Sequence, residues 1–413
     1  MIQTARATSI LERPTYLDWL IRHKDEQIIK VLSGVRRCGK STLFKIYCNY
    51  LLDCGVAQER IINLNFEDIA FEHLLDYKKL HSYIDSQLAA HEMNYIFLDE
   101  VQHVRGFEKA VDSLFLKENC DVYITGSNAY FMTGELATQL SGRYIELRML
   151  PLSFKEFSGG ITNENSNLTK AEVFELYLKM SSFPHVLRYG YGQAEADEYL
   201  RDIYNTVLLK DVVTRLKVAD VSVLENVTKF LLHNIGSRTS SSKIANTLKS
   251  SGKTIDQKTV DRYIRGLTDS LILYETTRYN VKGKQFLAQQ NKYYAVDIAL
   301  RNMLTPGEDG DIGHILENIV YLELLRRGNS VYVGQMDDGS EIDFVAMKDG
   351  KIAYYQGSAT TLAEETLKRE LSPLEKIADN HPKYLITLDE VFGNVDYQGI
   401  QKVNALDWLL QNG

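Results

Sequence analysis

Proline and cysteine are scarce in this chain of 413 residues. Only six prolines occur, so long disordered linkers are not expected. The four cysteines form no CxxC pair, and a chain of this length does not depend on a disulfide scaffold. These absences argue against a small secreted protein, and we expect a reducing, cytoplasmic location.

Long hydrophobic runs are also missing. No stretch of about 18 apolar residues is present, so no transmembrane helix and no membrane partner are predicted. The first residues, MIQTARATSILERPTY, lack the apolar segment of a signal peptide. Hydrophobic residues make up 44% and charged residues 25%, as in ordinary globular domains. At about 100–200 residues per domain, the length suggests roughly two to four domains.

The charge is distributed unevenly. The whole chain carries a net charge of -8, but the segment from Lys229 to Lys292 holds twelve Lys and Arg against four Asp and Glu. This segment therefore has a local balance of +8, which leaves -16 for the rest of the chain. The pattern indicates a basic module attached to acidic ones.

The first 155 residues alternate between apolar strand-like runs and helical segments. Such alternation predicts an α/β fold with a parallel sheet and crossover helices. The expected strands are Gln27–Gly34, Arg60–Phe66, Tyr95–Glu100, Asp121–Ser127 and Arg143–Leu150.

A phosphate-binding motif follows the first of these strands. Residues 34–41, GVRRCGKS, fit the pattern GxxxxGK[ST] between an apolar strand and a helix. The glycines let backbone N–H groups point at phosphates, and the helix N-terminus adds partial positive charge. Lys40 is expected to reach the β- and γ-phosphates, Ser41 to bind Mg²⁺, and Thr42 to touch the α-phosphate. The predicted nucleotide contacts are Gly34, Val35, Arg36, Arg37, Cys38, Gly39, Lys40, Ser41 and Thr42, with one of the two arginines facing phosphate or a neighbouring acid.

Later polar residues predict the remaining parts of a hydrolytic site. The strand IFLDE ends in Asp99, expected in the Mg²⁺ shell, and Glu100, expected to activate the attacking water. Asn128 or Ser127, after the next strand, is a candidate γ-phosphate sensor. Arg143 is a candidate arginine finger acting in cis or on a neighbouring subunit, and a surface ion pair is an equal alternative.

Several segments together resemble a prokaryotic family of AAA-type ATPases whose C-terminal half is of unknown function. The matching segments are GVRRCGKST (34–42), FLDEVQHV (97–104), ITGSNA (124–129), LSGRYIELRMLPLSFKEF (140–157), LENIVYLELLRRG (316–328) and EIDFV (341–345). The resemblance implies an AAA fold at residues 1–155 and ATP hydrolysis with Mg²⁺. It leaves the oligomeric state open, and a homo-oligomer is compatible with it.

The middle of the chain predicts two helical modules. Residues 156–228 are mostly helical and suggest a lid or linker. Residues 229–305 predict a winged helix, with three short helices and a two-stranded wing. Its candidate DNA contacts are Lys258, Arg262 and Arg265 on the recognition helix, and Lys282 and Lys284 in the wing. Winged helices also dock proteins, and that alternative stays open here.

Residues 306–413 resemble the restriction-endonuclease-like fold in their order of helix, three strands, helix and strand. Glu317, Asp343 and Gln356 fall at the places of the metal-binding residues in that fold, and their hard oxygens suit a divalent metal. Ser358 stands where the nucleases have a catalytic lysine. This departure favours a domain without nuclease activity.

The complete sequence predicts an ATP- and Mg²⁺-dependent switch that couples its nucleotide state to double-stranded DNA. Two alternatives remain, an ATP-gated metal-dependent nuclease and a signalling ATPase that docks a protein partner.

Overall fold

The computed structural model describes residues 11–126, 140, 142–162, 167–188, 192–253, 255–306, 311–391 and 394–411. The chain divides into two compact units, one formed by residues 10–151 and the other mainly by residues 152–413. Among the described residues, no helix combines the length and apolar character needed to cross a bilayer.

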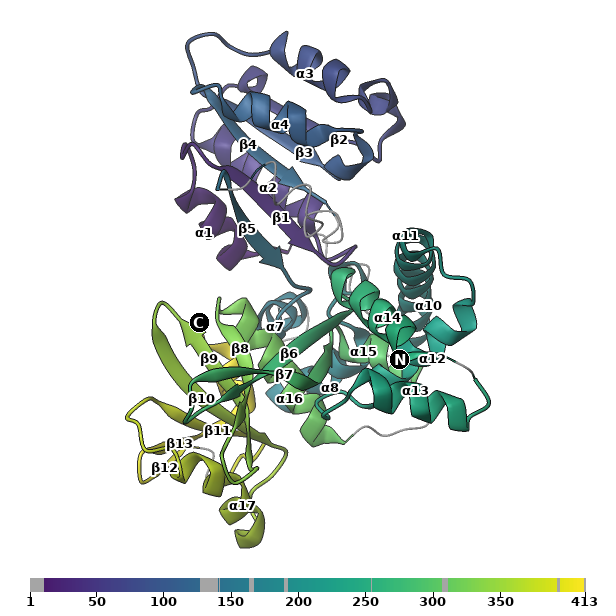
Figure 1. Cartoon of the computed structure of the whole chain (residues 1–413). Coiled ribbons are helices and arrows are strands. Elements are labelled where there is room, and N and C mark those ends of the chain that lie inside the picture. Colours follow the sequence, from purple (N-terminus) through teal and green to yellow (C-terminus); the bar gives the residue numbers. More distant parts are fainter. Residues whose placement is uncertain are drawn as a thin grey trace. The chain divides into compact units, whose positions relative to one another are not determined.

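The unit of residues 10–151 is built on an all-parallel sheet with strand order β2-β3-β4-β1-β5 (Figure 1). All five predicted strands are present, and the α/β parallel-sheet prediction is confirmed. The strands are β1 (Ile29–Gly34), β2 (Ile61–Asn65), β3 (Asn94–Asp99), β4 (Cys120–Thr125) and β5 (Tyr144–Met149). The helices are α1 (Pro14–Arg22), α2 (Lys40–Asp53), α3 (Tyr77–Asp85) and α4 (Phe107–Phe115), with short 3₁₀ turns at Gln58–Arg60, Ile69–Leu74 and Val101–His103.

Helices cover both faces of this sheet. Apolar side chains of α3 and α4, such as Leu80 and Val111, form one core cluster with Ile96 of β3 and Ile124 of β4. On the opposite face, Phe44 and Tyr47 of α2 pack edge-on against Phe97 of β3. Because β1, β3 and β4 are buried along their whole length, most of their residues are apolar. Two exceptions, Lys30 of β1 and Asp121 of β4, form an ion pair with each other.

The second unit begins with helices and continues into a mixed sheet (Figure 1). The first helices are α7 (Phe154–Thr162), α8 (Lys170–Met180), α9 (Pro184–Arg188) and α10 (Gln193–Tyr204), which runs on through a π-helical stretch (Asn205–Val213) into α11 (Thr214–Leu216). Then come α12 (Val221–His233), α13 (Ser241–Ser250), α14 (Gln257–Asp269), β6 (Leu273–Asn280), β7 (Gln285–Ala295) and α15 (Ile298–Leu304). Helices α12, α13 and α14 contact one another, and α14 contacts β6.

The rest of the chain contains α16 (Ile312–Arg326), β8 (Ser330–Gln335), β9 (Glu341–Lys348), β10 (Lys351–Ser358), α17 (Glu364–Glu375), β11 (Lys383–Thr387), β12 (Val395–Tyr397), β13 (Ile400–Asn404) and α18 (Ala405–Leu410). The sheet order is β12-β13-β11-β10-β9-β8-β6-β7. Since β6 pairs in parallel with β8, the two strands expected as a wing continue the sheet of the nuclease-like region.

Candidate nucleotide site and associated surfaces

The phosphate-binding loop connects β1 directly to α2. Gly34 has φ +156° and Gly39 has φ +107°. A Cβ on Gly34 would lie 2.4 Å from the Met149 carbonyl oxygen and 2.9 Å from Cys38 Sγ, so only glycine fits this close approach. Cys38 is fully buried, and burial raises the pKa of its thiol, which is therefore an inert packing group in this loop.

Lys40 lies folded over its own loop. Its Nζ donates to the Gly34 carbonyl oxygen at 3.1 Å and the Val35 carbonyl oxygen at 3.4 Å, and it lies 3.8 Å from Glu100 Oε1. Both Lys40 and Glu100 are largely buried, so solvent screens the attraction between their opposite charges only weakly. The structure thus brings together the predicted phosphate lysine and the predicted general base.

The two acids at the end of β3 are organised by Thr125 of the neighbouring strand. The Thr125 hydroxyl donates to Asp99 Oδ1 and accepts the backbone N–H of Glu100 at 2.9 Å. Glu100 has φ +53°, a left-handed conformation that is unfavourable for a residue with a side chain. Its carboxylate also accepts from Gln102 Nε2 at 2.6 Å. Thr125 and Gln102 were not among the predicted site residues. Thr125 nevertheless stands just before the predicted γ-phosphate sensors Ser127 and Asn128 in the sequence.

The donors around Asp99 suit a magnesium ion. Burial raises the pKa of Asp99, while hydrogen bonds from Thr125 and Ser41 act in the opposite direction. Ser41 and Asp99, which the sequence predicted as metal ligands, therefore meet, and hydroxyl and carboxylate oxygens are ligands that Mg²⁺ accepts. Close by, Glu67, Glu100 and His103 place one ligand atom each within 4.8 Å of one another. Glu67 was missed, although its place just after β2 puts it at the same edge of the sheet.

Arg13 supports the loop from the N-terminal side of the unit. This buried arginine donates to the carbonyl oxygens of Cys38 at 3.2 Å, Leu150 at 2.8 Å and Pro151 at 3.3 Å. It fixes the loop to the end of β5. No motif marked Arg13 in the sequence, because its partners are 25 and 137 or more positions away.

The remaining predicted contacts divide into three groups. One of the two loop arginines was expected to face phosphate or a neighbouring acid, and Arg36 pairs with the acid Glu67. Arg143 pairs with Asp112 and lies over the Phe115 ring. It stands just before β5, and its carbonyl oxygen accepts the N–H of Ile29 at the start of β1. The loop lies at the other end of β1, about 16 Å away at roughly 3.3 Å per residue, so Arg143 is not brought to it within one chain. Ser127 and Asn128 lie outside the described residues.

Comparison with known proteins agrees with this geometry. The family described as AAA domain matches residues 26–158, and a domain of unknown function matches residues 171–310. An uncharacterised protein of Haemophilus influenzae is 38% identical over 409 residues, covering 98% of this chain and 99% of that protein. The chain belongs to this AAA-domain family. An uncharacterised protein of Methanocaldococcus jannaschii is a more distant relative of this chain. The two are 28% identical over 403 residues, which cover 92% of this chain and 85% of that protein.

Among solved structures, a Walker-type ATPase of Pyrococcus abyssi resembles the AAA-domain protein with a TM-score of 0.50 at 16% identity. The match covers 73% of this chain and 97% of that chain. The likeness supports the fold of a P-loop ATPase.

Helix α14 presents an exposed side that carries three cations and the acidic Asp261. Val260, Tyr263, Ile264 and Leu267 are buried on one side, whereas Lys258, Arg262 and Arg265 are exposed on the other. Asp256 caps the helix by accepting from the Thr259 N–H at 2.9 Å. A Cβ on Gly266 would lie 2.5 Å from Leu216 Cδ1, so this glycine lets α14 pack closely against α11. The structure therefore gathers the three predicted helix contacts on one exposed face.

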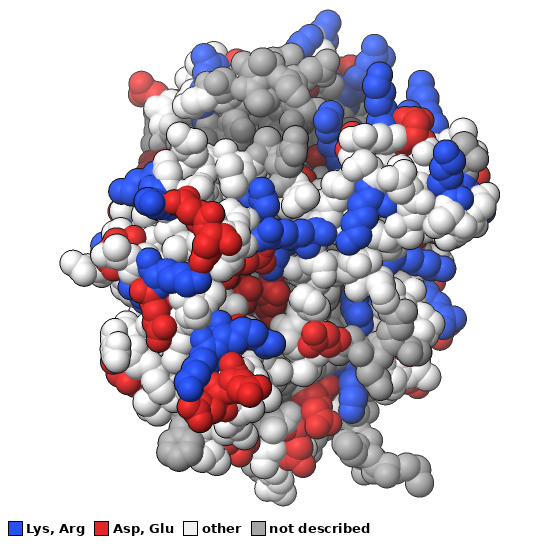
Figure 2. Space-filling view, turned by 60° about the horizontal axis from the view of Figure 1, so that its bottom comes forward, with Lys and Arg blue, Asp and Glu red and all other residues white. Residues whose placement is uncertain are grey.

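The loop between β6 and β7 carries the other two predicted contacts. Lys282 and Lys284 are exposed, and Lys282 forms an ion pair of 3.1 Å with Asp337. Thr239 pairs with Asn291 of β7 in an antiparallel bridge, which joins the segment before α13 to the hairpin. On the face drawn in Figure 2, Lys and Arg side chains surround a central recess in which acidic side chains lie.

The three predicted residues of the nuclease-like region lie near one another on α16, β9 and β10. Glu317 and Asp343 both face Lys292 of β7, at 2.8 Å and 3.8 Å. The Gln356 side chain has other partners than their carboxylates: Oε1 accepts from the Asp343 N–H at 3.2 Å, and Nε2 donates to Glu370 at 2.9 Å. Lys292 was not recognised in the sequence as part of this site.

Proposed function

We propose that this protein is a Mg²⁺-dependent ATPase whose nucleotide state controls binding to double-stranded DNA. The ATPase part rests on the AAA-domain family and on the junction of Lys40, Asp99 and Glu100 at one edge of the sheet. The observation that carries the DNA part is the set of three exposed cations on α14, Lys258, Arg262 and Arg265.

The residues divide the chemistry of hydrolysis between them. The amides of the loop and the Lys40 ammonium bind the phosphates, and Ser41 and Asp99 would hold Mg²⁺, which when bound neutralises phosphate charge. Glu100 orients a water molecule and accepts its proton. Thr125 keeps Glu100 in its strained conformation, so it acts as a positioning residue.

For the rest of the chain we propose a division of labour. Residues 1–155 act as the ATPase core, 156–228 as a helical lid or linker, 229–305 as a winged helix, and 306–413 as a nuclease-like domain. The continuous pairing of β6 with β8 means that the last two parts would move together. Arg143 remains a candidate finger for a neighbouring subunit in a homo-oligomer.

DNA binding through α14 is tested by fluorescence anisotropy with a labelled duplex at several salt concentrations. We expect Arg262→Ala plus Arg265→Ala to weaken binding at least tenfold. The slope of log K against log salt should fall by about 2, since about two phosphate contacts are lost.

The matched control changes the same amount of charge on another exposed helix. Lys368→Ala plus Arg369→Ala removes two cations from α17. The side chains of Lys368 and Arg369 are 74% and 73% exposed. This control should bind duplex DNA like the wild type. Equal binding by the two double variants would refute α14 as the DNA surface and would favour the docking of a protein partner.

A further inference from the structure

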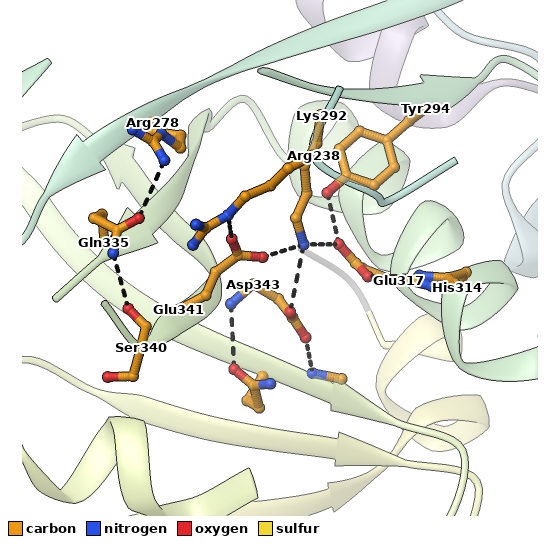
Figure 3. Close-up of polar contacts among 12 residues, drawn as sticks. Arg238, Arg278, Lys292, Tyr294, His314, Glu317, Gln335, Ser340, Glu341 and Asp343 are labelled. Carbon is orange, nitrogen blue, oxygen red and sulfur yellow. Dashed lines mark hydrogen bonds and ion pairs between the residues drawn. The ribbon is translucent and has the colours of Figure 1, made fainter. Parts of the chain in front are cut away.

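A largely buried ionic cluster joins the predicted winged helix to the nuclease-like region (Figure 3). It draws Arg238 from the segment after α12, Lys292 from β7, Glu317 from α16, and Glu341 and Asp343 from β9. The cluster therefore spans the boundary that the sequence placed at residue 305.

Lys292 lies at the centre of the cluster. Its side chain is 4% exposed, and Nζ lies 2.8 Å from Glu317 Oε1, 2.5 Å from Glu341 Oε1 and 3.8 Å from Asp343 Oδ1. Three carboxylates thus converge on one ammonium group. A buried charge is tolerated only when it is paired in this way.

The carboxylate oxygens of Glu317 already have protein donors. Oε1 accepts from Lys292 and also from the Tyr294 hydroxyl at 2.7 Å, and Oε2 lies 3.4 Å from His314 Nδ1. The chain approaches closely here, because a Cβ on Gly236 would lie 2.9 Å from both Glu317 Oε2 and His314 Nδ1. A metal ion at Glu317 would have to displace these donors.

The other two acids are occupied as well. Asp343 Oδ2 accepts from the Gly357 N–H at 2.8 Å, and Glu341 pairs with Arg238. Burial and the nearby Glu317 carboxylate raise the pKa of Asp343 well above its usual range.

The nuclease pattern is broken on β10 in two ways. The Gln356 side chain is bound to Asp343 N–H and to Glu370. Ser358, at the usual lysine position, donates its hydroxyl to the Thr360 carbonyl oxygen at 3.0 Å. Neither side chain takes the place of the missing lysine beside Glu317 and Asp343. Among the described residues of β7, β9 and β10, the cation that contacts these acids is Lys292.

We propose that Lys292 is the resident cation of this site, replacing the divalent metal of a nuclease and locking β7 to α16 and β9. The ion pairs of Lys292 with Glu317 and Glu341 then serve as an ionic lock between the predicted winged helix and the C-terminal part. Phosphodiester cleavage is not a function of this cluster.

The test measures Mn²⁺ binding to the nucleotide-free full chain by electron paramagnetic resonance, which detects the free ion. Four proteins are compared: the wild type, Asp343→Asn, Lys292→Met and the double variant Lys292→Met plus Asp343→Asn. Ions bound at the nucleotide site are common to all four. Differences between the proteins therefore report the cluster alone.

We expect the wild type and Asp343→Asn to bind the same number of ions. Lys292→Met should bind one additional equivalent, and the double variant should lose it again. The melting temperature of Lys292→Met should be several degrees below that of the wild type, and Mn²⁺ should restore part of the difference.

Three results would overturn the proposal. The first is an ion that the wild type binds and Asp343→Asn loses, and the second is cleavage of linear DNA with Mn²⁺ that Asp343→Asn abolishes; in either case Lys292 would assist a working metal site. The third is a folded Lys292→Met protein that binds no additional ion. If Lys292→Met does not fold, the comparison of the wild type with Asp343→Asn still decides.

Discussion

Replacing Thr125 with valine removes one hydroxyl from the centre of the nucleotide site and keeps the shape of the side chain. Thr125 is fully buried, and its hydroxyl is bonded to the Asp99 carboxylate and to the Glu100 N–H. Leaving a buried carboxylate short of one donor costs about 1–3 kcal/mol of stability. The left-handed backbone of Glu100, with its own cost of about 1–3 kcal/mol, also loses the contact that holds it.

The larger effect is expected on turnover. If Glu100 relaxes by about 1 Å, the rate of hydrolysis should fall roughly 100-fold, which corresponds to about 2.7 kcal/mol in the barrier. ATP binding should change little, because Lys40 and the loop amides are untouched. The variant should therefore show a lower kcat with a nearly unchanged KM.

Steady-state ATPase kinetics and urea unfolding test both parts of this prediction. Thr125→Ser is the matched control, since it keeps the hydroxyl, and its kcat should stay within about threefold of the wild type. A Thr125→Val protein with wild-type kcat would refute the idea that this hydroxyl positions the acids.

Two further predictions concern buried charges. The Asp389 side chain is 2% exposed, and this burial acts to raise its pKa. Hydrogen bonds from Thr360, Lys402 and Thr361 outweigh the effect of burial and lower the pKa to about 2. Because this folded value is below the ordinary 3.8, the group stabilises the protein above about pH 4, and this contribution of about 2 kcal/mol is lost as the pH falls to about 2. Urea unfolding across this range should show that Asp389→Asn removes this part of the pH dependence, and an unchanged profile would contradict it. In the first unit, Lys30 and Asp121 form a fully buried pair of 2.6 Å, so Asp121→Ala should cost about 3–5 kcal/mol. The double variant Lys30→Met plus Asp121→Ala should recover part of that loss in the same assay, and additive losses would count against the pairing.

The parallel sheet and the phosphate-binding loop could be predicted because their signals are local. The loop pattern is contiguous from Gly34 to Ser41, and the buried strands are mostly apolar, with a few polar residues such as Lys30 and Asp121 among them. Parallel strands align their carboxyl ends, so Ser41 and Asp99 could also be expected to meet.

The residues that were missed depend on contacts between distant parts of the chain. Lys292 faces Glu317 and Asp343, which lie 25 and 51 positions further along, and no pattern near Lys292 marks it as buried. Thr125 looks like the last residue of an ordinary strand. Arg143 was expected as an arginine finger or as a surface ion pair; the register of β5 with β1 puts it at the other end of the sheet from the loop, where it pairs with Asp112.

ATP hydrolysis at low salt, with and without duplex DNA, tests the central claim most directly, with Glu100→Gln as the control. The account predicts a rate that duplex DNA raises and that Glu100→Gln lacks while still binding ATP. A rate that Glu100→Gln retains, or one that duplex DNA leaves unchanged, would contradict the proposal of a DNA-coupled ATPase.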